Sequence, residues 1–297
     1  MDIEFNKNED HLRSLLSQLR QTAEQIQLGG GKKSIEKQHE KNKKTARERI
    51  EYLLDKNAPF LEIGKFAGHG MYPEFGGCPA GGTVAGIGYI NGKQCVVVAN
   101  DQTVKAGAWF PITGKKNLRL QEIAMENHLP IIYLVDSAGV FLPLQEDIFP
   151  DKEHFGRIFR NNAKMSAMGI PQIAAVMGAC VAGGAYLPIM SDETLMVEGN
   201  GSVFLAGSYL VKAAIGEEVD NESLGGAAMH AKISGTADAT FKTEEACLDH
   251  IKKLVGLLPS NQKRVLTESN QCLQLRNLVP FMVFSQKMAN PMTPLNY

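Results

Sequence analysis

Two apolar runs ending in glycine-rich turns, Pro130-Ile-Ile-Tyr-Leu-Val-Asp-Ser-Ala-Gly139 and Pro171-Gln-Ile-Ala-Ala-Val-Met-Gly-Ala-Cys-Val-Ala-Gly-Gly184, are the strongest structural signals in this chain. Each run is too short for a typical helix and too apolar for a strand with one face in water. Between them, residues 155–168 have helical spacing. Buried strands that alternate with helices are typical of a parallel sheet covered on both faces. The sequence therefore predicts an α/β fold with a partly parallel sheet.

Other elements extend this prediction in both directions. Residues 83–90 and 93–100 flank Asn91-Gly92, a dipeptide that suits a type I′ turn, and predict a β-hairpin. We predict helices over residues 6–27, 32–54, 113–127, 208–215 and 244–258, and short strands over 194–197 and 202–205. The Lys- and Arg-rich helix over 32–54 is expected to present a solvated face, with a phosphate-contacting surface as the alternative. The expected organisation is a helical extension over 1–60, one domain over 61–258, and a helical segment with a divergent tail over 259–297.

Composition excludes several functions. The 297 residues include 31 basic and 32 acidic side chains, so no overall charge recruits nucleic acid or an anionic membrane. The start of the chain is acidic and has no apolar signal segment, and no stretch approaches the roughly 18 apolar residues of a membrane span, which predicts a cytoplasmic location. Five widely spaced cysteines without a C-x-x-C pair argue against disulfides and zinc, and we expect ordinary thiols and no metal.

Glycine clusters follow the predicted strands at four places, residues 100–107, 136–139, 182–185 and 205–207. Ligands gather outside the carboxyl ends of strands in open α/β sheets. A Gly-Gly pair between a strand and a helix can direct two successive N–H groups into one concavity, which suits a developing oxyanion. Gly183 and Gly184 are therefore the candidate oxyanion hole, and a simple tight turn is the alternative.

A protein nucleophile or base is hard to find beside this hole. Ser137 is not in a G-x-S-x-G elbow, and the sequence has no H-E-x-x-H motif and no P-loop. The seven histidines show no mutual metal spacing. Oxyanion donors without a protein base suggest chemistry in which the base comes from a cofactor.

Eight segments resemble the carboxyltransferase subunits of biotin-dependent acyl-CoA carboxylases, and especially the β subunits of methylcrotonyl-CoA carboxylase. They are PEFGGCPAGGTV (73–84), ANDQTVKAGAWFP (99–111), QEIAM (121–125), YLVDSAGVFLP (133–143), FPDKEHFGRIF (149–159), MGACVAGGAYLP (177–188), FLAGSYLVKAAIGEEV (204–219) and LGGA (224–227). The resemblance runs almost continuously from about residue 45 to residue 258.

The resemblance implies a crotonase-like fold of spiralling ββα units and transfer of a carboxyl group from carboxybiotin to an acyl-CoA such as 3-methylcrotonyl-CoA. It assigns the enolate to the amides of Gly183 and Gly184, and the base to the ureido nitrogen of biotin. The implied partners are a biotin carboxylase or biotin carrier subunit and further copies of the chain. The resemblance also implies a CoA pocket lined by Lys105, Ala106, Gly107, Ser137, Ala138, Gly139 and Gly207.

Two lysines and one departure from the family pattern qualify this assignment. Lys115 and Lys116 are candidates to meet CoA phosphates, although a helix start with two lysines is also an ordinary surface. Ala138-Gly139-Val140-Phe141 stands where many relatives have Gly-Gly-Ala-Tyr, which leaves the acyl group open among methylcrotonyl, geranyl and others.

The last residues do not resemble the family. From Pro280 onward, a shifted reading frame permits the peptide IYGIFPEDGKPYD, which is similar to the family's linker into a second domain. We therefore expect a frameshift between about Leu275 and Pro280 with a truncated product, and a divergent natural tail is the alternative. Two other functions stay open: a CoA-binding module without turnover, and an acyl-CoA hydratase or isomerase that uses Asp192 and Glu193.

Overall fold

The computed structural model describes residues 3–148 and 152–259 of the chain. The chain divides into two units between Gln25 and Ile26. Helix α1 (Ile3–Gln27) confirms the helix predicted over 6–27, and its residues up to Gln25 belong to the first unit. The second unit begins at Ile26 and contains the sheet. The predicted frameshift lies outside the described residues, and the domain boundaries at residues 61 and 258 stay predictions.

The second unit is built on one mixed sheet with the strand order β1-β2-β3-β4-β5-β6-β8, and β7 also pairs with β5. Strands β1 to β3 are antiparallel, whereas β3, β4, β5, β6 and β8 run parallel, as does β7 beside β5. This arrangement confirms the partly parallel sheet. The strands are β1 (Leu61–Glu62), β2 (Thr83–Ile90), β3 (Lys93–Asn100), β4 (Ile131–Ser137), β5 (Gln172–Val181), β6 (Glu193–Val197), β7 (Ser202–Phe204) and β8 (Ala239–Phe241).

The hairpin between β2 and β3 forms as predicted. Asn91 and Gly92 have φ angles of 49° and 72°, which is the positive-φ pair that a type I′ turn requires. The carboxylate of Asp55 accepts hydrogen bonds from the N–H groups of both residues, at 2.8 and 2.7 Å. Local sequence and one side-chain cap therefore fix the register of the two strands.

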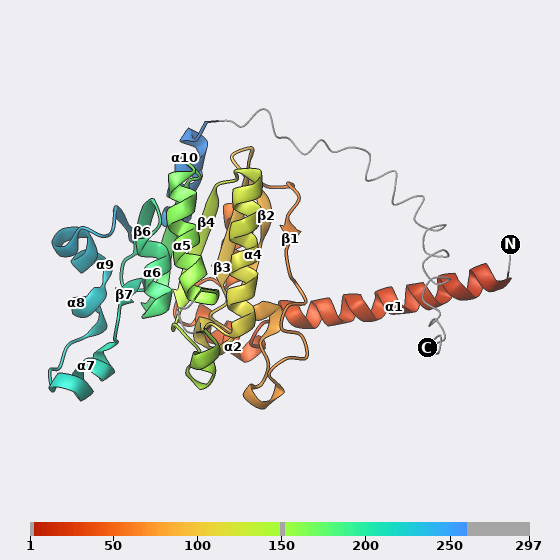
Figure 1. Cartoon of the computed structure of the whole chain (residues 1–297), viewed down its shortest axis with the longest axis horizontal. Coiled ribbons are helices and arrows are strands. Elements are labelled where there is room, and N and C mark those ends of the chain that lie inside the picture. The colour runs from red at the N-terminus through yellow and green to blue at the C-terminus, as the bar shows by residue number, and fades with distance from the viewer. Residues whose placement is uncertain (1–2, 149–151, 260–297) are drawn as a thin grey trace, which may run out of the picture. The chain divides into compact units, whose positions relative to one another are not determined.

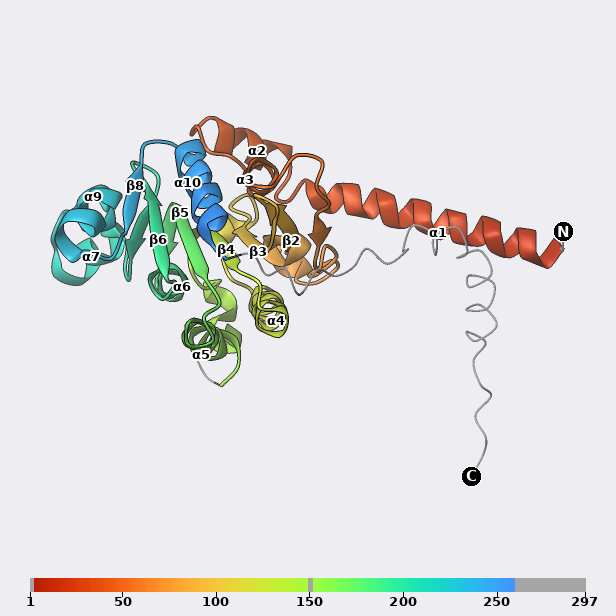
Figure 2. The ribbon, with the colours of Figure 1, turned by 90° about the horizontal axis from the view of Figure 1, so that it is seen from above.

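Helices cover both faces of the sheet (Figures 1 and 2). Helices α4 (Pro111–Asn127), α5 (His154–Ala167) and α6 (Gly183–Ile189) lie on one face, and α3 (Ala46–Leu53) and α10 (Glu244–Leu257) lie on the other. Side chains alternate between the two cores along β3: Val96 and Val98 pack with α4 and α5, whereas Val97 packs with α3 and α10. Burial on both faces explains why the strands are continuously apolar.

The prediction of one solvated helix over 32–54 is wrong. The structure has two helices, α2 (Lys32–His39) and α3, because Asn42 adopts a left-handed conformation and Thr45 caps α3 in a capping box with Glu48. Two of the cations are also buried rather than solvated: Lys43 and Arg49 are 9% and 1% exposed. Their carboxylate partners come from distant parts of the chain.

The remaining elements are short. They are α7 (Ser208–Ile215), α8 (Asn221–Gly225), α9 (Ala227–Met229), the 3₁₀ segments η1 (Pro73–Phe75), η2 (Pro79–Gly82), η3 (Lys105–Gly107) and η4 (Leu142–Ile148), and the π-helical turn η5 (His230–Ser234). Within residues 3–148 and 152–259, no helix is both long and apolar enough to cross a membrane, and no three His, Cys, Asp or Glu side chains gather as metal ligands. Four of the five cysteines lie in the described part, and all four are buried free thiols.

Candidate functional site

Three of the four predicted glycine clusters meet at the carboxyl edge of the sheet. The backbone N–H of Ala138 donates to the carbonyl of Ala106 at 3.0 Å, and the hydroxyl of Ser137 donates to the carbonyl of Gly107 at 2.7 Å. Gly184 completes the group, because a Cβ placed on it would lie 3.4 Å from Oγ of Ser137. Parallel pairing of β3, β4 and β5 explains the meeting, since parallel strands bring their carboxyl ends to one edge.

Gly183 and Gly184 open helix α6 immediately after strand β5. Ala182, between the strand and the helix, has φ 51° and ψ −121°, a conformation that turns the backbone sharply. Its N–H donates to the carbonyl of Phe204 at 3.1 Å, which anchors the turn to β7. The first N–H groups of a helix have no acceptor within the helix. The N–H groups of Gly183 and Gly184 are therefore suited to bind an oxygen atom of a ligand.

The loop after β3 has an unusual backbone. Lys105, Ala106 and Gly107 have φ angles of 48°, 55° and 67°, three left-handed residues in succession. Only Gly107 is buried, and a Cβ there would lie 2.1 Å from the carbonyl oxygen of Asp136, so glycine is required. Lys105, Ala106 and Ala138 are exposed and form the open rim of the site.

An aromatic wall runs beside Gly183. The ring of Phe155 would lie 3.5 Å from a Cβ on Gly183. The rings of Phe155 and Phe159 are 5.5 Å apart, and those of Phe159 and Tyr186 are 5.2 Å apart. Tyr186 is 47% exposed, so this wall reaches from the interior to solvent. It is suited to contact an apolar group whose polar end is held by the glycines.

The two predicted phosphate-binding lysines have different environments. Lys115 is exposed on α4, whereas Lys116 is buried and its ammonium group donates to the carbonyls of Gly64, Ala80 and Thr83 at 3.2, 2.9 and 2.6 Å. Burial lowers the pKa of Lys116 to about 8. Because its donors already have acceptors in the interior, we assign Lys116 no contact with a ligand.

Gly207 is connected to the site only indirectly. It is the N-cap of α7, and a Cβ on it would lie 3.4 Å from the ring of Phe204. The carbonyl of Phe204 in turn holds Ala182. The fourth glycine cluster therefore flanks the turn before Gly183 and does not join the three others directly.

The acidic residues considered for a hydratase lie elsewhere. The carboxylate of Asp192 accepts from Ser166 Oγ at 2.6 Å and from the N–H of Gln172 at 2.8 Å, at the amino end of β5. Glu193 begins β6 and pairs with Ile173 at the same edge. These carboxylates are therefore at the edge of the sheet opposite the glycine clusters.

Cys180 lies beneath the site and its thiol donates to the carbonyl of Gly184 at 3.0 Å. Burial raises the pKa of Cys180, which keeps the thiol neutral and unsuited to nucleophilic attack.

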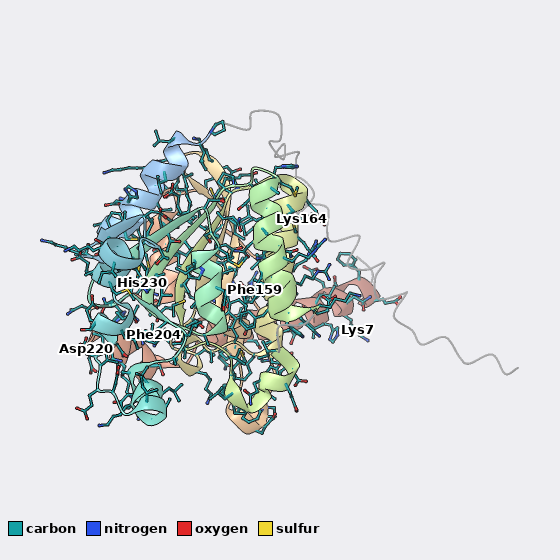
Figure 3. The ribbon with its side chains drawn as sticks, turned by 60° about the vertical axis from the view of Figure 1, so that its left-hand side comes forward. Lys7, Phe159, Lys164, Phe204, Asp220 and His230 are labelled. Carbon is teal, nitrogen blue, oxygen red and sulfur yellow. The ribbon has the colours of Figure 1, made fainter. Side chains whose placement is uncertain are left out.

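The buried His230 contacts the carbonyl of Val203 through Nε2 at 2.8 Å, beside β7 (Figure 3).

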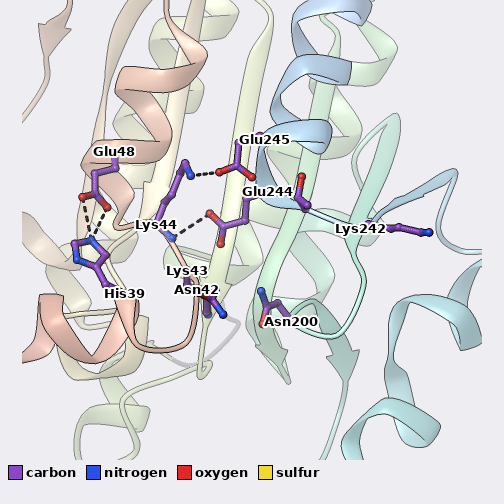
Figure 4. Close-up of a pocket in the computed structure, with 10 residues that line it drawn as sticks. His39, Asn42, Lys43, Lys44, Glu48, Asn200, Lys242, Glu244 and Glu245 are labelled. Carbon is purple, nitrogen blue, oxygen red and sulfur yellow. Dashed lines mark hydrogen bonds and ion pairs between the residues drawn. The ribbon is translucent and has the colours of Figure 1, made fainter.

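Sequence reasoning missed a buried charge network that reaches the site from the other face of the sheet. Arg49 lies between the carboxylates of Asp136 and Glu244, and Lys43 contacts Asp136 at 2.6 Å. Lys43 and Glu244 also line a pocket of about 640 Å³ between the start of α3 and the start of α10. Figure 4 shows three contacts within this lining: His39 with Glu48, the ammonium group of Lys44 with Glu245, and the backbone N–H of Lys44 with the carboxylate of Glu244.

Comparison with known proteins gives one consistent family. The model of the family described as the carboxyl transferase domain matches residues 37–280 of this chain. The chain is 50% identical to the methylcrotonoyl-CoA carboxylase β chain of Dictyostelium discoideum over 285 residues, covering 93% of this chain and 48% of that protein. It is 49% identical to the 3-methylcrotonyl-coenzyme A carboxylase β1 subunit of Mycobacterium tuberculosis over 245 residues, covering 82% and 46%.

Solved structures agree with the sequence comparison. The β subunit of geranyl-CoA carboxylase from P. aeruginosa superposes with a TM-score of 0.79 at 36% identity, covering 88% of this chain and 48% of that one. This likeness confirms the predicted crotonase-like α/β fold. The chain spans about half the length of the relatives that it matches.

Proposed function

Because the chain belongs to the carboxyl transferase family, we propose that it forms the acyl-CoA side of a biotin-dependent acyl-CoA carboxylase. The observation that carries the proposal is the meeting of the Gly183-Gly184 turn with the loops at residues 105–107 and 136–139. A thioester carbonyl placed there would face two backbone N–H groups, while the rest of the substrate lies against the exposed rim.

The proposed chemistry is stabilisation of an enolate. The N–H groups of Gly183 and Gly184 donate to the thioester oxygen, and the negative charge on that oxygen grows as a proton leaves the acyl group. Fixed donors therefore favour the enolate over the neutral thioester. Loss of one such donor typically costs about 2.7 to 4 kcal/mol in the transition state. Carboxybiotin on a partner protein would supply the carboxyl group, and its ureido nitrogen would accept the proton that leaves the acyl group; we assign no residue of this chain to either role.

The proposed CoA contacts follow the exposure of the predicted residues. Lys105, Ala106 and Ala138 lie along the rim, and Lys115 is free of the interior contacts that hold Lys116. We propose that the rim residues line the path of the pantetheine chain and that Lys115 meets a phosphate group. Ser137 and Gly139 shape this path from below, through the bond from Gly139 N–H to Ser137 Oγ at 3.1 Å.

The proposed acyl group is branched and apolar, with 3-methylcrotonyl as the first candidate. The wall of Phe155, Phe159 and Tyr186 beside Gly183 supports an apolar group at this position. The names of the relatives, methylcrotonyl- and geranyl-CoA carboxylases, point the same way.

The partners and the location are also proposals. We propose that the chain acts with a biotin-carrying subunit and with further copies of itself. The relative from Dictyostelium is named a mitochondrial protein, so the cytoplasmic location stays a prediction.

A coupled assay tests the function. The purified chain is mixed with 3-methylcrotonyl-CoA and a biotin carrier protein charged with carbon dioxide, and the carboxylated CoA product is measured by mass spectrometry. Product that depends on the charged carrier is the expected result. Tight binding without product would favour the second candidate, a CoA-binding module, which the coverage of about half of each relative keeps open. Hydrated product formed without biotin would contradict both.

A further inference from the structure

Strands β4 and β5 change register beside Asp136. Val135 pairs with Val176, but Ser137 pairs with Cys180, so the single residue Asp136 lies opposite residues 177–179 of β5. The two additional residues form a bulge in β5. Bulges bend a strand and redirect the chain after it, and here the bulge directly precedes the turn into α6.

The carboxylate of Asp136 fills this bulge. A Cβ on Gly178 would lie 1.9 Å from Oδ1 and 2.3 Å from Cγ of Asp136, so the carboxylate occupies the space that a side chain would need. Asp136 is 1% exposed, and its Oδ1 has no hydrogen-bond partner among the described residues. A buried, unpaired carboxylate oxygen is unfavourable by itself. Other contacts must therefore hold this side chain in place.

Arg49 and Lys43 provide those contacts. Nη1 and Nη2 of Arg49 both donate to Asp136 Oδ2 at 3.2 Å, and Lys43 Nζ lies 2.6 Å from the same oxygen. Nη2 of Arg49 also donates to the carbonyl of Met177, within the bulge, at 3.4 Å.

Glu244 holds the guanidinium from the other side. It accepts from Nε of Arg49 at 3.0 Å and from Nη2 at 2.6 Å. Burial alone would lower the pKa of Arg49, but Asp136 and Glu244 raise it, so the guanidinium stays charged. Arg49 is therefore a cationic partner for Asp136.

Both halves of the candidate site start at this clamp. Along β4, Asp136 is followed directly by Ser137, whose hydroxyl joins the carbonyl of Gly107 to the N–H of Gly139. Along β5, the bulge is followed by the turn that presents Gly183 and Gly184. A shift of the Asp136 carboxylate would consequently move the two loops relative to each other.

We propose that Asp136, clamped by Arg49 and Lys43, is a positioning residue that aligns the Gly183-Gly184 amides on the thioester carbonyl. None of the three charged side chains touches the substrate; they act through the bulge and the 136–139 loop. The inference rests on the proposed function, because it concerns how well the amides fit the carbonyl group.

The test compares two ligands that differ only in that carbonyl group: 3-methylcrotonyl-CoA, and the thioether analogue in which a methylene replaces the carbonyl. The readout is the ratio of their dissociation constants, measured by calorimetry with the full chain. We expect the wild type to prefer the thioester. Asp136→Asn should reduce that preference roughly tenfold, the size of effect expected when one or two hydrogen bonds to the carbonyl are misplaced. Affinity for the thioether should change little, which a merely structural loss would not produce.

A milder pair of variants keeps the test decisive if Asp136→Asn does not fold. Lys43→Gln removes one contact to Asp136, and Lys44→Gln makes the same change one residue later, where the lysine pairs with Glu245 instead. Lys43→Gln should lower the thioester preference and Lys44→Gln should not.

Equal preference in wild type, Lys43→Gln and any folded Asp136→Asn would overturn the positioning role and leave the proposed function intact. A wild type without any preference for the thioester would contradict the proposed function, and the inference with it.

Discussion

Replacing Ala182 with glycine should stabilise the protein, although an alanine-to-glycine change inside a helix normally destabilises a protein. Ala182 joins β5 to α6 with φ 51° and ψ −121°, outside the regions that residues with a Cβ prefer. Such conformations cost about 1 to 3 kcal/mol for a residue other than glycine. Glycine adopts them without that cost.

Two smaller effects oppose the gain. Glycine makes the unfolded chain more flexible, which costs about 0.4 to 1 kcal/mol. Removing the half-buried methyl group of Ala182 loses part of the roughly 0.8 kcal/mol that one buried carbon contributes. The net expectation for Ala182→Gly is a gain of about 1 kcal/mol. For Ala185→Gly, on the buried side of α6, we expect a loss of about 1 kcal/mol or more, because its backbone is helical and has no strain to release.

Urea unfolding followed by circular dichroism measures both variants against the wild type. The urea midpoints of the two variants should move in opposite directions, while the dependence of the free energy of unfolding on urea concentration stays that of the wild type. Equal destabilisation by Ala182→Gly and Ala185→Gly would show that the turn before Gly183 and Gly184 stores no strain.

Three further predictions concern other parts of the fold. Gly92→Ala should lower the free energy of unfolding by about 1 kcal/mol, because its φ is 72° but its surroundings are open. Gly107→Ala should lower it by at least twice as much, because its Cβ would also meet a carbonyl oxygen at 2.1 Å. Chemical denaturation of the two variants compares these losses. Burial alone would raise the pKa of Glu62, but two hydrogen bonds from Arg47 hold that pKa below its usual value. Its stabilising effect is therefore present above about pH 4.3 and is lost as pH falls through the lowered pKa, so Glu62→Gln should be less stable than wild type at pH 7 and equal to it in acid; unfolding midpoints that differ by the same amount at both pH values would disprove this. Lys116→Met should lower the free energy of unfolding by about 1 to 3 kcal/mol by leaving buried carbonyls without donors, and no loss on thermal unfolding would contradict the burial.

Local patterns were enough to predict most of the sheet and its helices. The Asn91-Gly92 turn and the apolar runs of β4 and β5 carry their information within a few residues. Glycines at strand ends were enough to predict which loops lie together in the candidate site, because parallel strands bring their carboxyl ends together whatever the loops contain.

Long-range charge pairing could not be predicted in the same way. Arg49 appeared to belong to a solvated basic helix, since its partners Asp136 and Glu244 are 87 and 195 residues away in the sequence. The different burial of Lys115 and Lys116, by contrast, could have been predicted from helical spacing. Lys116 is four residues before the buried Leu120 and therefore on the inner face of α4, whereas Lys115 is turned about 100° away from it.

The most direct test of the central claim is calorimetric titration of 3-methylcrotonyl-CoA into the wild type, Gly184→Val and Ala163→Val. A valine at 184 would fill the space toward Ser137 and Gly139, while Ala163 is exposed on α5 and provides a control that introduces the same side chain away from the site. We predict that wild type and Ala163→Val bind alike and that Gly184→Val binds more weakly, by on the order of tenfold or more, as expected when hydrogen bonds to the carbonyl are lost. Wild-type affinity in a folded Gly184→Val variant would contradict a thioester site at Gly183 and Gly184.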